Sequence, residues 1–138
     1  MQLTKTLRAL LVLSGLMAGF IGASILFTPA QFHAGHGIEL GANVNLMSEV
    51  RAPGGALLVL GALMLVGAFV RSFTLVSTVI AAAVYLAYGA ARLVSLGLDG
   101  VPDAGLVGAT AIELVTGAAC AIALFRASKR AEPAGELA

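Results

Sequence analysis

Four long stretches of this chain carry almost no charge, and they constrain its fold more than any other feature. They cover residues 9–27, 53–70, 72–98 and 104–125, and the charged side chains inside them are Arg92 and Glu113. Each run is long enough to cross about 30 Å of hydrocarbon as a helix, at about 1.5 Å per residue. Because the runs are continuously apolar rather than alternating, they predict helices and exclude the strands of a membrane barrel.

The composition indicates the same class of protein. Of the 138 residues, 59% are hydrophobic and 11% are charged, so there is too little polar surface to enclose a single core. This excludes a water-soluble monomer, and it excludes a disordered chain, which needs low hydrophobicity and high charge. The net charge of +1 indicates no basic surface of the kind that binds nucleic acid. A single cysteine excludes an internal disulfide.

The basic residues predict the orientation of the helices. With four crossings, six of the eight fall on one side, which is the cytoplasmic side in most membrane proteins: Lys5, Arg8, Arg71, Arg126, Lys129 and Arg130. We therefore predict that residues 1–130 form one antiparallel bundle of four transmembrane helices in the bacterial inner membrane. Both termini are expected in the cytoplasm, with residues 131–138 as a flexible tail. The first run exceeds the apolar part of a signal peptide, so we expect it to remain as a span.

The long connection between the first two spans has its own predicted structure. Residues 43–51 are expected to form a short interfacial helix, because an apolar side recurs within them. Pro53 is then expected in the first turn of the second span, where its missing N–H costs nothing.

Small residues predict how the helices pack, since membrane helices associate through close backbone approach. Gly15, Gly19 and Ala23 recur every four residues in the first span, and Gly54, Gly61 and Ala68 recur every seven in the second. These stripes predict packing inside the bundle or, alternatively, a homodimer face.

A polar stripe runs along the third span and predicts one buried face. Its members are separated by three, four or seven residues: Thr74, Thr78, Tyr85, Tyr88, Arg92, Ser95 and Asp99. The fourth span carries a second such face, formed by Thr110, Glu113, Gly117 and Cys120. An ionised side chain at mid-bilayer costs about 2.5 to 3.5 kcal/mol, so Arg92 and Glu113 should both point into the bundle.

Depth allows these two charges to meet. Arg92 lies about 9 Å below the outer boundary and Glu113 about 14 Å below it, a difference that an arginine side chain can span. We predict an Arg92–Glu113 ion pair, with Tyr88 or Tyr85 completing its hydrogen bonds. Arg51 and Glu49 are expected to extend this cluster at the outer rim, where Gly54 and Gly55 let helices approach. The expected result is a polar pocket open to the outside.

The cluster supports two functional hypotheses and one structural one. Arg51, Arg92 and Glu113, with Tyr85, Tyr88 and Glu49, could bind a small anionic or lipid-like ligand, because a guanidinium fits carboxylate and phosphate groups. The same ion pair could instead fix the rotation of the helices in an accessory subunit of a membrane complex. The alternative is a proton-coupled small transporter that acts as a homo-oligomer, with Glu113 as the titrating group.

Other candidate sites are less specific. His33 and His36 could hold one metal ion with Glu39, but the glycines around them favour a solvated loop, and we predict neither a metal nor a cofactor. Cys120 is expected to be a small buried apolar residue. No nucleophile with a base and no phosphate-binding loop is present, so an enzyme is not the favoured class.

Several short motifs of this chain resemble, in order and spacing, a known bacterial family of small four-helix membrane proteins. They are the string from Ser48 to Gly55, Arg92-Leu93 with Ser95, Asp99-Gly100 and Glu113-Leu114. The family carries only a domain-of-unknown-function label, so the resemblance implies a membrane location and four spans but no activity.

The resemblance also marks individual residues. It puts Glu49, Arg51, Gly54, Gly55, Arg92, Asp99, Gly100 and Glu113 on the family's polar and glycine positions. We ourselves expect packing roles for Asp99, Gly100 and the glycines. Pro53 departs from the pattern, which has an aromatic residue before the double glycine, so no aromatic lid over the site is carried over.

Overall fold

The computed structural model describes residues 4–131, and these residues are helical with no strand. The elements are α1 (Lys5–Phe27), α2 (Pro29–Ala34), α3 (Val44–Phe69), the single 3₁₀ turn η1 (Arg71–Phe73), α4 (Thr74–Asp99) and α5 (Ala104–Ala131). Within this part of the chain, four helices are long and apolar enough to cross a membrane: α1, α3, α4 with its preceding turn, and α5. The protein is thus an all-α, multi-pass membrane protein by length and composition.

Side chains at the helix ends explain several boundaries. Thr4 accepts a hydrogen bond from the Leu7 N–H at the start of α1, and Asn43 accepts from two N–H groups at the start of α3. These contacts satisfy N–H groups that have no partner within the helix. Gly100 has a φ of +100°, a backbone conformation that favours glycine, and it ends α4.

The helices are longer than the apolar runs. α1 begins four residues before the predicted span, and α5 continues to Ala131 rather than ending near Phe125. Hydropathy measures only the part of a helix that tolerates hydrocarbon, whereas a helix continues into the interface wherever its backbone bonds are satisfied. Residue 131 therefore belongs to α5, and the rest of the predicted tail lies outside the described residues.

The predicted interfacial helix is wrong in one respect. Residues 44–51 are helical, but they form the first two turns of α3 instead of a separate element. Pro53 consequently lies inside a helix rather than in its first turn. Proline lacks the N–H that would bond the carbonyl four residues earlier, which here belongs to the exposed Glu49, where water can satisfy it.

Glycines bring α1 and α3 into backbone contact. A Cβ built on Gly61 would lie 2.6 Å from the Gly19 nitrogen and 2.8 Å from the Gly15 carbonyl oxygen. One built on Gly22 would lie 2.4 Å from the Leu58 nitrogen. The predicted stripe on α3, Gly54–Gly61–Ala68, is buried as expected. On α1 the buried glycines and alanine are Gly15, Ala18 and Gly22, whereas a Cβ on Gly19 would meet nothing within 4 Å.

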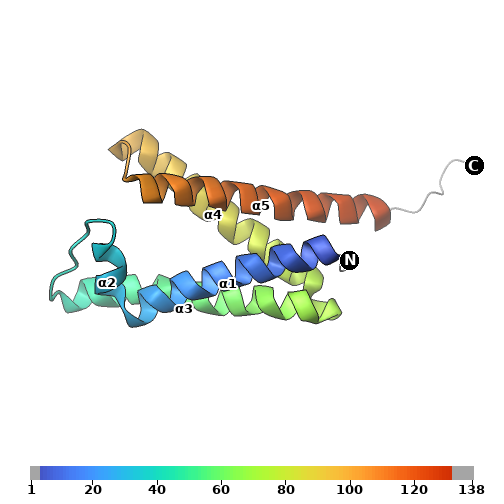
Figure 1. The fold of residues 1–138 in the computed structure, drawn as a ribbon, viewed down its shortest axis with the longest axis horizontal. Helices are drawn as coiled ribbons and strands as arrows, with labels where there is room; N and C mark the ends of the chain where they lie inside the picture. The colour runs from blue at the N-terminus through green and yellow to red at the C-terminus, as the bar shows by residue number, and fades with distance from the viewer. Residues whose placement is uncertain (1–3, 132–138) are drawn as a thin grey trace, which may run out of the picture.

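The helices form two packed pairs, α1 with α3 and α4 with α5, which lie side by side in Figure 1. α4 crosses obliquely behind the others, from the end of α3 toward the opposite end of the molecule (Figure 1). The most fully buried side chains, among them Leu11, Met64, Thr78 and Cys120, belong to the half of the molecule that holds the α3–α4 turn. The core therefore joins the two pairs at one end.

Candidate functional site

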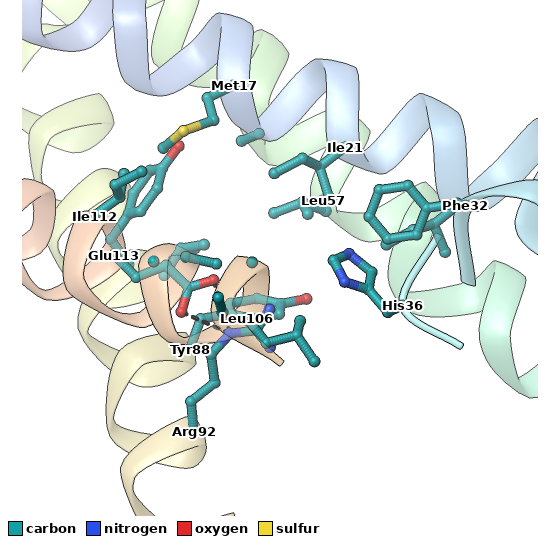
Figure 2. A pocket seen from close by; sticks show the side chains of 18 residues that line it. Met17, Ile21, Phe32, His36, Leu57, Tyr88, Arg92, Leu106, Ile112 and Glu113 are labelled. Carbon is teal, nitrogen blue, oxygen red and sulfur yellow. Dashed lines mark hydrogen bonds and ion pairs between the residues drawn. The ribbon is translucent and has the colours of Figure 1, made fainter. Parts of the chain in front are cut away.

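A cavity of about 450 Å³ lies in the half of the molecule away from the α3–α4 turn, and the core residues Ala18, Leu57 and Tyr85 form part of its wall. Its walls come from α1, α3, α4, α5 and the segment around α2 (Figure 2). Most of its lining is apolar, contributed by side chains such as Met17, Ile21, Ile25, Leu57, Val84 and Ile112. A pocket of this size and composition is typical of small-molecule sites, which add a few polar groups to a mainly apolar wall.

The predicted ion pair lies in the wall of this cavity. The Arg92 Nε donates to both carboxylate oxygens of Glu113, at 2.9 and 3.1 Å (Figure 2). Glu113 is 12% exposed and Arg92 is 34% exposed, so the carboxylate is the more deeply placed partner. The prediction that these charges pair inside the bundle is confirmed, and it followed from the high cost of leaving either one in lipid.

The pairing leaves part of the guanidinium available. Both oxygens of Glu113 are bonded by the Nε of Arg92, and no residue among 4–131 accepts a hydrogen bond from either terminal amino group. Arginine carries five N–H donors in a rigid fork, and the two terminal groups are the ones that bind a carboxylate or phosphate in two places. Arg92 is thus both neutralised by Glu113 and still able to donate.

The two tyrosines of the predicted stripe have different environments. Tyr85 lines the cavity, but its hydroxyl donates to the Ser14 carbonyl of α1 at 2.7 Å, so the prediction that it completes the ion pair is wrong. A helical carbonyl oxygen can accept a second hydrogen bond from a side chain, and the Ser14 carbonyl is the one within reach of this hydroxyl. Tyr88 also lines the cavity and is 38% exposed, with no hydrogen bond to the described residues.

The predicted polar stripe on α4 makes different contacts in the two halves of the molecule. In the half with the core, Thr74 donates to the Gly67 carbonyl at 2.9 Å and Ser77 to the Leu63 carbonyl at 2.6 Å, which ties α4 to α3. In the other half, Ser95 and Asp99 are exposed and bond to each other at 2.8 Å. The prediction of one continuous buried face therefore holds only as far as Tyr85, because Tyr88 is exposed and Arg92 is partly exposed.

Arg51 and Glu49 do not extend the cluster. The Arg51 guanidinium bonds the Leu26 carbonyl, and this residue lines a separate groove together with Thr28 and Met47. Because α3 begins nine residues earlier than expected, its first turns project beyond the cavity, and the free carbonyls at the end of α1 offer Arg51 a better partner. Glu49 is exposed. Of the two adjacent glycines, a Cβ built on Gly54 would lie 2.7 Å from an Ile25 side-chain carbon, whereas one built on Gly55 would meet nothing nearer than 3.9 Å.

His36 belongs to this site, although no sequence pattern placed it there. Its ring lines the cavity near Phe32 (Figure 2), and its Nδ1 lies 3.3 Å from an oxygen of Asp103. His33 is turned elsewhere, with its Nδ1 2.8 Å from the Pro29 carbonyl. The two imidazoles therefore do not share a ligand, and the described residues contain no group of three side chains suited to a metal. Loops, unlike helices and strands, have no regular residue spacing that shows which side chains meet, so no sequence pattern could have indicated this contact.

Asp103 has a second role at the start of α5. Its Oδ1 accepts hydrogen bonds from the N–H groups of Gly105 at 2.8 Å and Leu106 at 3.2 Å. Desolvation raises the pKa of Asp103, but these two bonds and the nearby His36 more than offset that, so its pKa is lower than usual. Asp103 therefore remains an ionised acceptor throughout the neutral range.

Comparison with known proteins places the chain in a family. No curated protein and no solved structure matches it. Residues 6–124, well over half of the chain, match the family described as domain of unknown function (DUF4345). The match covers α3 and α4 entirely, most of α1 and α5, and the Arg92–Glu113 pair, and it agrees with the resemblance of the sequence motifs. This protein therefore belongs to the DUF4345 family.

Proposed function

We propose that this protein binds an amphipathic ligand with an anionic head group in the cavity between its two helix pairs. The observation that carries the proposal is the combination of a mainly apolar wall with a guanidinium whose terminal donors are unused by residues 4–131. The apolar side chains suit a hydrocarbon chain, and the fork of Arg92 suits a carboxylate or phosphate. A lipid-like molecule fits this lining better than a small inorganic anion, which would leave the apolar wall unused.

We further propose that the bundle is antiparallel in the inner membrane, with both termini in the cytoplasm. The basic residues at the start of α1, in η1 and at the end of α5 support this orientation through the positive-inside rule. The view in Figure 1 supports it as well, because the start of α1 and the end of α5 lie toward the same end. In this orientation the cavity belongs to the outer half of the membrane.

Two other roles make different predictions. An accessory subunit would use the ion pair only to fix helix rotation, and it would bind no ligand in the cavity. A proton-coupled transporter would need a Glu113 carboxylate that is free to exchange partners, but here both of its oxygens accept hydrogen bonds from the Arg92 Nε. The geometry therefore supports the binding role over the transporter.

The test compares three probes with the purified protein in detergent. We expect native mass spectrometry to detect a bound long-chain fatty acid, little binding of the fatty alcohol of equal chain length, and none of inorganic phosphate. Loss of a charge-assisted hydrogen bond costs about 1.5 to 3 kcal/mol, so the alcohol should bind about ten- to a hundredfold more weakly. Equal binding of acid and alcohol would contradict a role for Arg92, and tight binding of phosphate alone would contradict the lipid-like ligand.

Matched variants separate the head group from the chain. Arg92→Gln combined with Glu113→Gln removes both charges together, so neither is left unpaired in the bundle, and it should abolish the preference for the acid. Glu113→Gln alone removes the carboxylate that competes with the ligand for Arg92, so it should strengthen binding of the acid several-fold. If the protein were instead a proton-coupled transporter, the same substitution should abolish pH-dependent flux. Ala109→Phe fills the apolar part of the cavity and should weaken acid and alcohol equally. Ala118→Phe, on an exposed part of α5, is its control.

A further inference from the structure

The two helix pairs are joined unevenly along their length. In the half with the core, α4 is bonded to α3 through Thr74 and Ser77, and Tyr85 bonds α1 near the middle. In the other half, the hydrogen bond between His36 and Asp103 is the one that links the two sides within residues 4–131. A single polar contact therefore holds the mouth of the cavity together at the end where the pairs are least packed.

The residues around this contact allow it to form and to break. His36 follows α2 in the connection to α3, and Gly37, with a φ of +70°, comes directly after it. Phe32 supports the imidazole edge to face, with ring centroids 6.0 Å apart. On the opposite side, a Cβ on Gly105 would lie 3.4 Å from the ring, so the glycine leaves room for it beside Asp103.

We infer that His36 and Asp103 form a latch that closes the outer mouth of the cavity, and that the ligand exchanges when this latch opens. The part concerning the ligand rests on the function proposed above, whereas the opening itself is a property of the protein alone. Because the contact lies far from the packed end, breaking it lets the two pairs separate with little loss of core packing. The cavity then opens toward its ligand.

The chemistry of the contact makes the latch sensitive to pH. An ionised carboxylate only accepts hydrogen bonds, so the Nδ1 of His36 carries the proton that lies between them. Protonation of the second ring nitrogen adds a full charge and turns the hydrogen bond into an ion pair. The latch should therefore hold more tightly in mild acid than in mild base.

Apart from Asp103, no anionic side chain in the described residues lies within hydrogen-bond distance of His36. Within the lining that His36 shares, Arg92 and Glu113 are bonded to each other, and the remaining ionisable groups are the two tyrosines. On its own segment, His33 bonds a backbone carbonyl and Glu39 is exposed. Asp99, at the end of α4, accepts from Ser95.

The latch is tested by measuring the distance between two spin labels in the full-length protein in lipid nanodiscs. The labels replace the exposed Ile38 and Val101, one on each side of the mouth, in a Cys120→Ala background. We expect a shorter and narrower distance distribution at about pH 5 than at about pH 8, the range in which an imidazole gains its charge. Identical distributions at both pH values would overturn the latch.

Three variants identify the groups responsible. His36→Gln should remove the pH dependence, while His33→Gln, whose ring is outside the cavity, should retain it. Asp103→Asn should also remove it, and because asparagine caps a helix as well as aspartate does, α5 should remain intact. A pH dependence that survives in His36→Gln would overturn the assignment.

A parallel measurement separates the latch from the ligand. Dissociation of a fluorescent long-chain fatty acid should be several-fold slower at about pH 5 than at about pH 8, and His36→Gln should remove this difference. If the fatty acid fails to bind while the spin-label distances respond to pH as expected, the proposed function is wrong and the latch stands. If the fatty acid binds but neither its dissociation rate nor the spin-label distances change with pH, the latch is wrong and the proposed function stands.

Discussion

At the scale of single residues, most polar groups in the described part of this bundle bond to a backbone carbonyl or to each other. Ser14, Thr74, Ser77 and Thr78 are fully buried, and each hydroxyl donates to a carbonyl. No buried side-chain nitrogen or oxygen in residues 4–131 lacks a partner. In lipid an unmet polar group is costly, and two sets of donors in the cavity wall remain available for a ligand: the terminal N–H groups of Arg92 and the hydroxyl of Tyr88.

The hydroxyl of Tyr85 gives a residue-scale prediction. Tyr85→Phe removes the 2.7 Å bond to the Ser14 carbonyl, and we expect the free energy of unfolding to fall by about 0.6 to 1.5 kcal/mol. Tyr88→Phe is the matched control, because its hydroxyl has no partner among the described residues. The measurement is reversible unfolding in mixed micelles of denaturing and mild detergent. An equal effect of both substitutions would show that the bond to α1 contributes nothing.

Sequence reasoning succeeded at this scale where one physical cost dominated. Two embedded charges of opposite sign can avoid lipid only by meeting, so the pairing of Arg92 and Glu113 was predictable from helix spacing and depth. The partners of Tyr85 and Arg51 were not predictable, since both bond to backbone carbonyls of α1, and such acceptors are present at every residue. His36 was missed because its position depends on a loop.

At the scale of elements, glycines decide which helices pair. Gly15, Gly22 and Gly61 allow the backbones of α1 and α3 to touch, and Gly89 and Gly117 do the same between α4 and α5, against Leu114 and Leu86. The stripe on α3 was predictable from its seven-residue spacing, whereas the stripe on α1 was displaced by one position. The spacing of small residues defines two neighbouring faces when glycines are this frequent, and only packing selects between them.

The contact between α1 and α3 gives an element-scale prediction. Gly61→Ala places a methyl group 2.6 Å from the Gly19 backbone nitrogen, which cannot move away without displacing the helix. We expect a loss of about 1 to 3 kcal/mol in the free energy of unfolding. Gly19→Ala is the control, because its added methyl group meets nothing within 4 Å. If both substitutions are tolerated equally in the mixed-micelle assay, the two helices do not pack as closely as described.

At the scale of the whole molecule, the main feature is an uneven distribution of packing. The most fully buried side chains lie toward one end and the cavity lies toward the other, so the two helix pairs are packed together at one end and held by a single polar contact at the other. The number of spans was predictable from the apolar runs, because hydrocarbon thickness fixes their length. The cavity was not, because it depends on the angle at which α4 crosses, and no local pattern determines that angle.

The orientation gives a prediction for the whole molecule. In a Cys120→Ala background, an impermeant maleimide added to intact cells should label Ile38→Cys, which lies between α2 and α3. Ser128→Cys, near the end of α5, should react only after the cells are permeabilised. Both side chains are exposed in the structure, so differences in reactivity report the side of the membrane. The reverse pattern would place both termini outside the cytoplasm.

The glycine contact between α1 and α3 also bears on how the chain is made. Both helices belong to the first half of the sequence, and their backbones fit together without a side chain from α4 or α5 between them. Synthesis proceeds from the N-terminus, so this hairpin is complete while the second half is still on the ribosome. The first pair can thus assemble during insertion and serve as the template on which the later helices dock.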